Sequence, residues 1–131
     1  VNYVENHDNQ TLYDLHAFKL PLGTPSDERA RAQILAAALN AFSQGIAYYH
    51  AGIELLRSKS MDRNSFDSGD WFNRIDWTGH DNFFGSGLPP ARDNAASLGL
   101  EGRAAWRFAR GWTVRATSPS CSASSGRYRA R

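Results

Sequence analysis

Cysteine is almost absent from this chain, which has one cysteine, Cys121, among its 131 residues. One cysteine excludes an internal disulfide, so cysteine use does not indicate a redox compartment. The chain also has no apolar run that approaches the roughly 18 residues of a membrane helix, and no basic stretch followed by an apolar leader. We therefore expect no membrane partner, and the localisation stays unknown at this point.

The small net charge of +2 hides an uneven distribution. Residues 1–98 carry eight Lys and Arg against twelve Asp and Glu, a net charge of −4, whereas residues 99–131 carry seven Arg against Glu101, a net charge of +6. We expect residues 1–98 to form part of one folded domain, because a chain with 41% hydrophobic residues has enough apolar side chains for a core. Residues 99–131 are predicted to be an irregular basic tail, disordered or read in a shifted frame, with a partner-binding tail as the alternative.

Three segments predict regular structure. Residues 1–4 have the β-branched and aromatic character of a short strand, and residues 46–49 form a second apolar run of strand type. Between them, Thr24 as N-cap and Pro25 at the first helical position begin a helix over residues 25–43, whereas residues 11–24 are expected to be mostly loop, with room for one helical turn. Strand, helix and strand form a βαβ unit, which predicts the α/β class and a parallel sheet or barrel. The apolar residues of this helix recur at helical spacing: Ile34, Leu35, Ala38, Leu39 and Phe42.

A dense polar cluster, Glu5, Asn6, His7 and Asp8, follows the first predicted strand. In parallel α/β folds the chemistry lies at the carboxyl ends of strands, so this cluster is a candidate site. An ordinary turn is the structural alternative, since Asn and Asp also favour turns. A metal site of Glu5, His7 and Asp8 is a weaker reading, because no second cluster of ligands accompanies it.

Aromatic and charged residues alternate in the long segment over residues 56–94. Aromatic rings stack on the C–H faces of sugars, while charged and amide groups bind their hydroxyls, so the segment suits a carbohydrate partner. A surface loop folded on its own aromatic residues is the alternative. Nucleic acid is disfavoured, because the acids of the segment would repel phosphate.

Two stretches carry a family resemblance. "YVENHDNQTLYD", residues 3–14, resembles the fourth conserved region of the α-amylase superfamily of glycoside hydrolases, and within it the pullulanase-type, limit dextrinase-like debranching branch. "QGIAYYHAGIELLRSKSMDRNSFDSGDWFNRIDW", residues 44–77, is the more specific stretch, and its Gly52-Ile53-Glu54 is similar to the G-x-E region of the superfamily. The resemblance covers about residues 1–96, and Glu5, Asn6 and Tyr13 depart from the usual pullulanase pattern.

The resemblance implies a fold and an activity. The fold would be the last two β/α units of a (β/α)8 TIM barrel, followed by the irregular tail. The activity would be hydrolysis of α-1,6-glucosidic linkages in pullulan, amylopectin or limit dextrin, with retention at the anomeric carbon. Asp8 matches the carboxylate that stabilises the transition state. The residues implied to bind substrate are His7, Asn9, Asp62, Arg63 and Trp71.

The resemblance also implies what the chain does not supply. The nucleophile and the acid/base of the family lie on earlier strands, and no acid of this chain matches them, so we expect the isolated chain to be inactive. Glu54 is expected to be a structural hydrogen-bonding partner. No cofactor or metal is expected in this chain, although calcium occurs in full-length family enzymes, and the compartment would be extracellular or periplasmic in bacteria or the plastid in plants. A non-catalytic carbohydrate-binding fragment is the alternative function.

Overall fold

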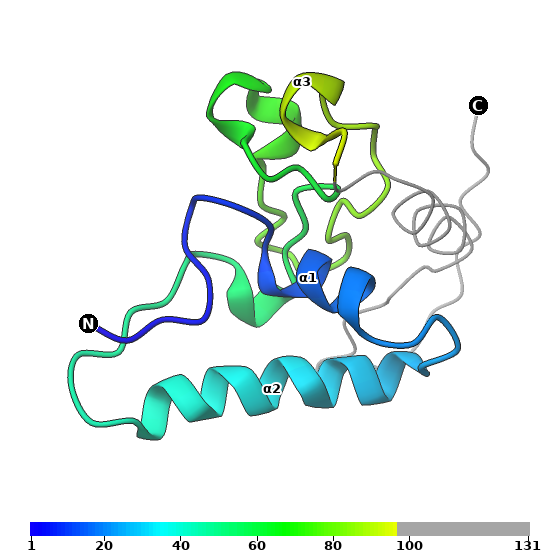
Figure 1. The fold of residues 1–131 in the computed structure, drawn as a ribbon. Helices are drawn as coiled ribbons and strands as arrows, with labels where there is room; N and C mark the ends of the chain where they lie inside the picture. The colour runs from blue at the N-terminus through cyan, green and yellow to red at the C-terminus, as the bar shows by residue number, and fades with distance from the viewer. Residues whose placement is uncertain (97–131) are drawn as a thin grey trace.

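The computed structural model describes residues 1–96, and its regular elements are helical. Helix α1 packs against the long helix α2, while the irregular segment that follows α2 lies on the other side of α1 and ends at α3 (Figure 1). The predicted boundary at residue 98 and the tail over residues 99–131 lie outside the described residues. The elements are α1 (Leu12–Lys19), α2 (Ser26–Phe42), the short 3-10 helices η1 (Ile53–Leu55), η2 (Ser65–Asp67) and η3 (Asp70–Phe72), and α3 (Ala91–Asn94).

The predicted α/β class, a partial (β/α)8 TIM barrel, is wrong for the part of the chain that the structure describes. The two predicted strands meet at one isolated parallel bridge between Asn2 and Ala47. Asn2 N donates to the Ile46 carbonyl at 2.8 Å, and Tyr48 N donates to the Asn2 carbonyl at 2.9 Å. The apolar side chains beside this bridge are exposed, so no packed face extends the pairing into strands.

Helix α2 confirms the predicted helix, which was placed over residues 25–43 and runs from Ser26 to Phe42. Its cap differs from the prediction, because Pro25 occupies the N-cap position and no side chain caps the helix. Asp27 and Glu28 lie in the first turn, where negative charge is favourable to the helix dipole.

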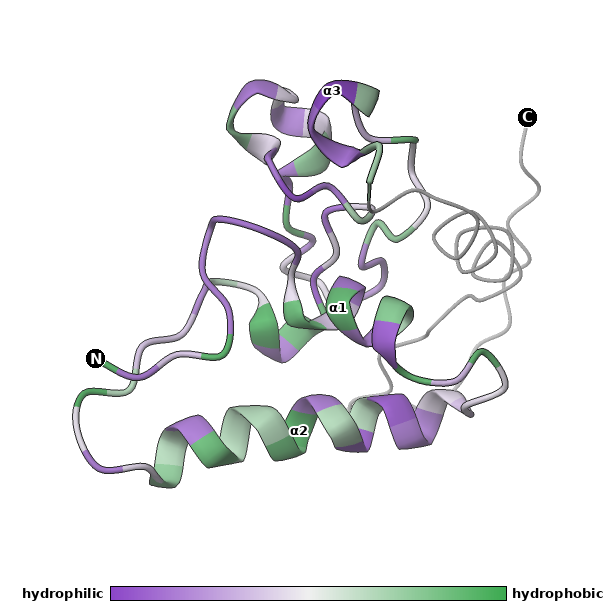
Figure 2. Cartoon of the chain, viewed as in Figure 1, coloured by the Kyte–Doolittle hydropathy of each residue, from purple (hydrophilic) through white to green (hydrophobic). Residues whose placement is uncertain are grey.

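The buried face of α2 is polar, and its predicted apolar stripe is exposed. Arg29, Gln33 and Asn40 are buried, and Gln33 Nε2 donates to the Ile53 carbonyl at 3.2 Å. Asn40 Nδ2 donates to the Tyr48 carbonyl at 2.7 Å, which joins α2 to the extended segment after it. Hydropathy along the helix passes from hydrophilic at its start to hydrophobic in its later turns (Figure 2). The exposed apolar residues on the helix are Ile34, Leu35, Leu39 and Phe42.

Helix α1 lies in a segment that was expected to be mostly loop. Thr11 is its N-cap, and the Thr11 hydroxyl accepts a hydrogen bond from Asp14 N at 3.2 Å. Leu12 and Tyr13 of α1 are buried, and the Tyr13 ring meets the Phe84 ring edge-on with centroids 5.4 Å apart. The cap and the two buried side chains stabilise a helix that ends at Lys19, before Pro21.

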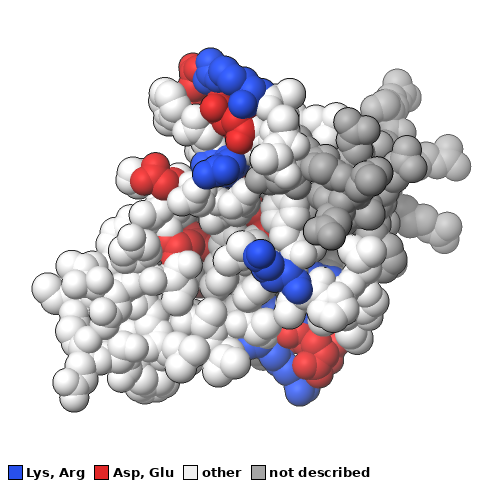
Figure 3. Space-filling view, in the orientation of Figure 1, with Lys and Arg blue, Asp and Glu red and all other residues white. Residues whose placement is uncertain are grey.

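Few large hydrophobic side chains are buried in the described residues: Leu12, Tyr13, Ile53 and Met61. Buried polar groups outnumber them, and segment 57–62 is buried throughout. On the face drawn in Figure 3, charged side chains gather near α3 and near the start of α2, while the end that holds the N-terminus carries none. Within residues 1–96, no helix is both long and apolar enough to cross a membrane.

Candidate functional site

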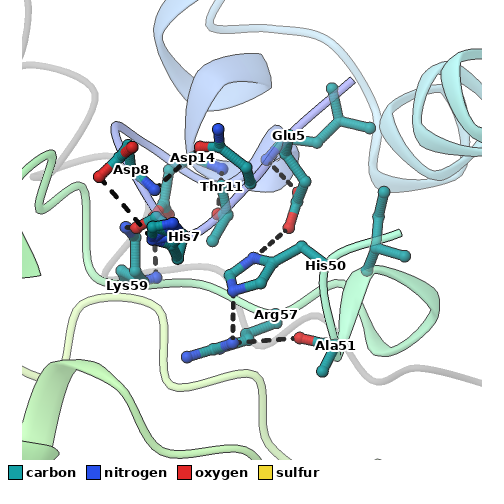
Figure 4. Close-up of polar contacts among 12 residues, drawn as sticks. Glu5, His7, Asp8, Thr11, Asp14, His50, Ala51, Arg57 and Lys59 are labelled. Carbon is teal, nitrogen blue, oxygen red and sulfur yellow. Dashed lines mark hydrogen bonds and ion pairs between the residues drawn. The ribbon is translucent and has the colours of Figure 1, made fainter. Parts of the chain in front are cut away.

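His7 and Asp8 lie side by side on an exposed loop, residues 5–9, which we call the polar loop (Figure 4). Their side chains are 74% and 72% exposed, and His7 Nδ1 lies 3.8 Å from Asp8 Oδ1. Asp8 N donates to Asn6 Oδ1 at 2.9 Å, an Asx-type turn that fixes the backbone locally. The two side chains are therefore free to bind a ligand from solvent.

Glu5 anchors the start of the polar loop. Its carboxylate is buried and accepts a hydrogen bond from Leu12 N, the first residue of α1, at 2.5 Å. The other carboxylate oxygen lies 2.8 Å from His50 Nδ1, and His50 Nε2 lies 3.1 Å from Arg57 Nη1. Because a guanidinium only donates, Nε2 accepts and the imidazole proton lies on Nδ1, which donates to Glu5. The loop is thus joined to α1 and to the segment after the parallel bridge.

The side chain of Lys59 contacts the main chain of the polar loop (Figure 4). The side chain is 1% exposed, and Nζ donates to the carbonyl oxygen of His7 at 2.9 Å. Asp14 of α1 fixes Lys59 in turn, since Asp14 Oδ2 accepts from Lys59 N at 2.8 Å. Asp14 Oδ1 accepts from the Ser58 hydroxyl at 2.5 Å, and Ser60 N donates to that hydroxyl at 2.8 Å. A buried polar network therefore supports the exposed His7 and Asp8.

Burial shifts the pKa of three groups in this network. It raises the pKa of Asp14 to about 6, although hydrogen bonds from Ser58 and Lys59 oppose the shift. Burial lowers the pKa of Lys59 and the pKa of Arg57, while nearby carboxylates raise both. The common cause is desolvation, which disfavours the charged form of each group.

Asp62 and Arg63 lie next to each other but differ in exposure. Asp62 is fully buried, and its Oδ1 accepts from Asn94 Nδ2 at 2.8 Å and from Asn64 N at 3.0 Å, while its Oδ2 has no partner among the described residues. Arg63 is exposed, and its Nη2 lies 3.5 Å from Asn9 Oδ1. Arg63 and Asn9 are therefore brought beside the His7 and Asp8 pair, whereas Asp62 is held inside.

Trp71 lies on the surface with its ring fixed from two sides. It is 53% exposed, and its Nε1 donates to the Ser86 carbonyl at 3.2 Å. The Arg74 guanidinium lies 3.9 Å from the centre of the Trp71 ring and 3.8 Å from that of Phe83. The cation–π contact and the hydrogen bond from Nε1 together restrain the orientation of the Trp71 ring.

The three residues of the weaker metal reading do not converge. The Glu5 carboxylate is buried and engaged by α1 and His50, while His7 and Asp8 point to solvent. Over residues 1–96, no group of three or more His, Cys, Asp and Glu side chains is placed to hold a metal ion.

The buried network that supports the polar loop was not predicted from the sequence. Glu54 is exposed among the described residues, and its expected role as a structural hydrogen-bonding partner stays a prediction. The buried carboxylates of the described residues are Glu5, Asp14 and Asp62. Thr11 followed by Asp14 was the available signal for α1, whereas nothing local indicates that Lys59 reaches a carbonyl 52 residues away.

Comparison with known proteins identifies relatives of this chain. No family model matches the chain. The chain is 52% identical over 94 residues to pullulanase 1 of Arabidopsis thaliana, described as chloroplastic, and 45% identical over 103 residues to the pullulanase of Klebsiella aerogenes. These matches cover 72% and 79% of this chain, and 10% and 9% of the relatives. The chain thus spans about a tenth of the length of the curated relatives it matches.

Solved structures agree with the sequence matches. PulA from Klebsiella oxytoca superposes with a TM-score of 0.76 at 41% identity, over 82% of this chain and 10% of that one. The pullulanase of Klebsiella pneumoniae complexed with maltotriose superposes with a TM-score of 0.71 at 39% identity, over 88% of this chain and 10% of that one. The chain is therefore similar to proteins that are named pullulanase. More particularly, it is homologous to one segment of the pullulanases, which confirms the resemblance predicted from residues 3–14 and 44–77.

Proposed function

We propose that this chain contributes part of the active site of a pullulanase-type enzyme, in which Asp8 stabilises the transition state and His7 binds the reacting sugar. The observation that carries the proposal is the His7 and Asp8 pair, exposed side by side on a loop whose backbone is anchored by buried groups. A carboxylate and an imidazole 3.8 Å apart can hold neighbouring hydroxyls of one sugar ring. A fixed backbone keeps both groups in place for that task.

The proposed reaction is retaining hydrolysis of an α-1,6-glucosidic bond. Its transition state resembles an oxocarbenium ion, and hydrogen bonds to the sugar hydroxyls strengthen as that charge develops. The carboxyl group of Asp8 suits this role, because its side chain is exposed and can reach the hydroxyls of a sugar. The nucleophile and the acid/base would come from other segments, since no acid here matches them, so the isolated chain should not hydrolyse pullulan.

An α-glucan is the proposed partner. The chain is homologous to pullulanases, and the structure of one of them was determined with maltotriose. Arg63 and Asn9 adjoin His7 and Asp8, and Trp71 offers an aromatic face of the kind that stacks on sugars. Asp62 is also proposed to bind substrate, which would require that its side chain, fully buried in the described structure, become accessible to the sugar.

The test uses the purified chain with pullulan and with maltotriose. We expect no release of reducing ends from pullulan, and we expect maltotriose to shift the NMR signals of His7 and Asp8. His7→Ala should weaken that binding, whereas His80→Ala, which changes another exposed histidine, should not. Turnover of pullulan that is lost in Asp8→Asn would show that the chain is a complete enzyme, and maltotriose shifts confined to other residues would remove His7 and Asp8 from the site.

A non-catalytic carbohydrate-binding role is the second candidate, and the fixed orientation of Trp71 favours it. In that case maltotriose binding would persist in His7→Ala and disappear in Trp71→Ala. The first candidate predicts loss in both variants, so the pair of measurements separates them.

A further inference from the structure

The ammonium of Lys59 is buried directly beneath the backbone of the proposed site. Its side chain is 1% exposed, and among the described residues its Nζ has one hydrogen-bond partner, the His7 carbonyl at 2.9 Å. Burying an ammonium is costly unless it is well paired. The hydrogen bond from Lys59 Nζ to the His7 carbonyl offsets part of the free-energy cost of burying the ammonium, and this hydrogen bond joins Lys59 to the polar loop.

The position of Lys59 is itself held rigidly. Asp14 Oδ2 accepts from Lys59 N at 2.8 Å, and the neighbouring Ser58 hydroxyl donates to Asp14 Oδ1. Two residues that follow, Ser60 and Met61, adopt left-handed backbone conformations with φ of 52° and 68°, and both are buried. Non-glycine residues rarely adopt this conformation unless their surroundings fix it. Lys59 thus extends from a rigid support.

The polar loop has few other contacts with that support beyond its first residue. Glu5 is buried and bonded, but the Asn6 side chain bonds within the loop, to Asp8 N. Arg63 reaches Asn9 at 3.5 Å, at the long end of the hydrogen-bond range. The charged hydrogen bond from Lys59 is therefore the strongest contact that the body makes with the loop at His7.

We propose that Lys59 is a positioning residue, whose ammonium fixes the main chain at His7 and thereby holds the side chains of His7 and Asp8 in place for the sugar. The inference rests on the proposed function for its consequence in glucan binding, but the order of the loop can be measured without any glucan. Lys59 does not touch the sugar. It acts through the His7 carbonyl.

The chain offers a clean probe, because Lys19 and Lys59 are its two lysines and Lys19 is exposed. Protein labelled with ¹⁵N-lysine should give one ammonium signal protected from exchange with solvent, from Lys59, and one unprotected signal, from Lys19. Lys59→Met removes the charge and keeps the length of the side chain, Lys59→Arg restores a cation, and Lys19→Met is the matched control.

We expect Lys59→Met to speed exchange of the Asp8 amide by about tenfold or more, as loss of one charged hydrogen bond implies. The Leu15 amide in α1, which donates to the Thr11 carbonyl, should be unchanged. Lys59→Arg should recover part of the protection, and Lys19→Met should resemble the parent chain. Unchanged exchange at Asp8 in Lys59→Met would overturn the proposal.

Two further measurements complete the test: exchange of the Lys59 ammonium protons in the parent chain, and the affinity for maltotriose. If Lys59→Met unfolds, the Leu15 amide will exchange fast, and the test then uses the parent chain. In the parent chain, Lys59 ammonium protons that exchange as fast as those of Lys19 would overturn the proposal. Maltotriose affinity, about tenfold weaker in Lys59→Met and recovered in Lys59→Arg, would support the consequence for binding. A parent chain that does not bind maltotriose would count against the proposed function, while the Asp8 exchange data would still decide the role of Lys59.

Discussion

Asp14 should make the stability of the chain depend on pH in a defined direction. Its carboxyl is 0% exposed, and burial raises its pKa to about 6 from the ordinary value of 3.8. Between these two values the folded chain keeps a proton that the unfolded chain has released, so stability falls as pH rises through this window. About two pKa units correspond to about 3 kcal/mol, lost between about pH 4 and about pH 6 and constant above that.

Asp14→Asn isolates this effect. The Asn carbonyl can accept from Lys59 N, and its amide can donate to the Ser58 hydroxyl, so the shape and most hydrogen bonds are kept while the titrating proton is removed. Urea unfolding followed by circular dichroism, at several pH values, gives the free energy of unfolding of both proteins. The other carboxylates contribute equally to the pH dependence of the parent chain and of Asp14→Asn, so their contributions cancel in the difference between the two free energies of unfolding. A difference that stays constant within about 0.5 kcal/mol from about pH 4 to about pH 7 would refute the reasoning.

Three further predictions concern packing and the glucan surface. Met61 is fully buried and Phe42 is 88% exposed, so Met61→Ala should lower the free energy of unfolding by about 2–5 kcal/mol and Phe42→Ala by less than about 0.5 kcal/mol in the same urea experiment. Trp71→Ala should weaken binding of α-1,6-linked oligosaccharides by roughly 1–3 kcal/mol in calorimetry, whereas Phe66→Ala, at another exposed aromatic residue, should not. Arg63→Ala should weaken the same binding by a similar roughly 1–3 kcal/mol, and unchanged affinity in both Trp71→Ala and Arg63→Ala would make the segment over residues 56–94 structural.

Helix α2 was predictable because its signals are local. Apolar residues at helical spacing and acids in the first turn are enough to place a helix within a residue of Ser26–Phe42. Which face of the helix is buried was not predictable, because periodicity identifies the apolar stripe but not its neighbours. Here Arg29, Gln33 and Asn40 face the rest of the described chain, through hydrogen bonds to main-chain carbonyls.

The two predicted strands failed for a related reason. Strand formation depends on neighbouring strands and packed side chains more than on intrinsic preference. Within residues 1–96, segments 1–4 and 46–49 pair only with each other, over one bridge. Helix α1 is longer than the one helical turn that was allowed for, because Pro21 and Gly23 favour a loop there, although Thr11 and Asp14 carry a capping pattern. The bridge itself does run parallel, with α2 between its two partners.

In the candidate site, too, local features were predictable from the sequence and long-range contacts were not. His7 and Asp8 are neighbours in sequence, so their proximity needed no structure, and the resemblance indicated their role. The supports of the loop come from positions far along the chain, His50 for Glu5 and Lys59 for His7, so only the fold could reveal them. Asp62 was placed with the substrate residues by the resemblance, whereas its burial against Asn94 depends on packing that a sequence pattern does not encode.

Pullulan hydrolysis by a chimera tests the role of Asp8 most directly. In the chimera, residues 1–96 of this chain replace the matching segment of the Klebsiella aerogenes pullulanase, and reducing ends released from pullulan are followed. We expect the chimera to be active and its Asp8→Asn variant to lose kcat by roughly a hundredfold or more with KM changed by at most about threefold, because the contacts of Asp8 strengthen mainly in the transition state. Asp27→Asn should leave both parameters unchanged. An Asp8→Asn chimera that keeps a kcat near that of the parent chimera would contradict the proposed function.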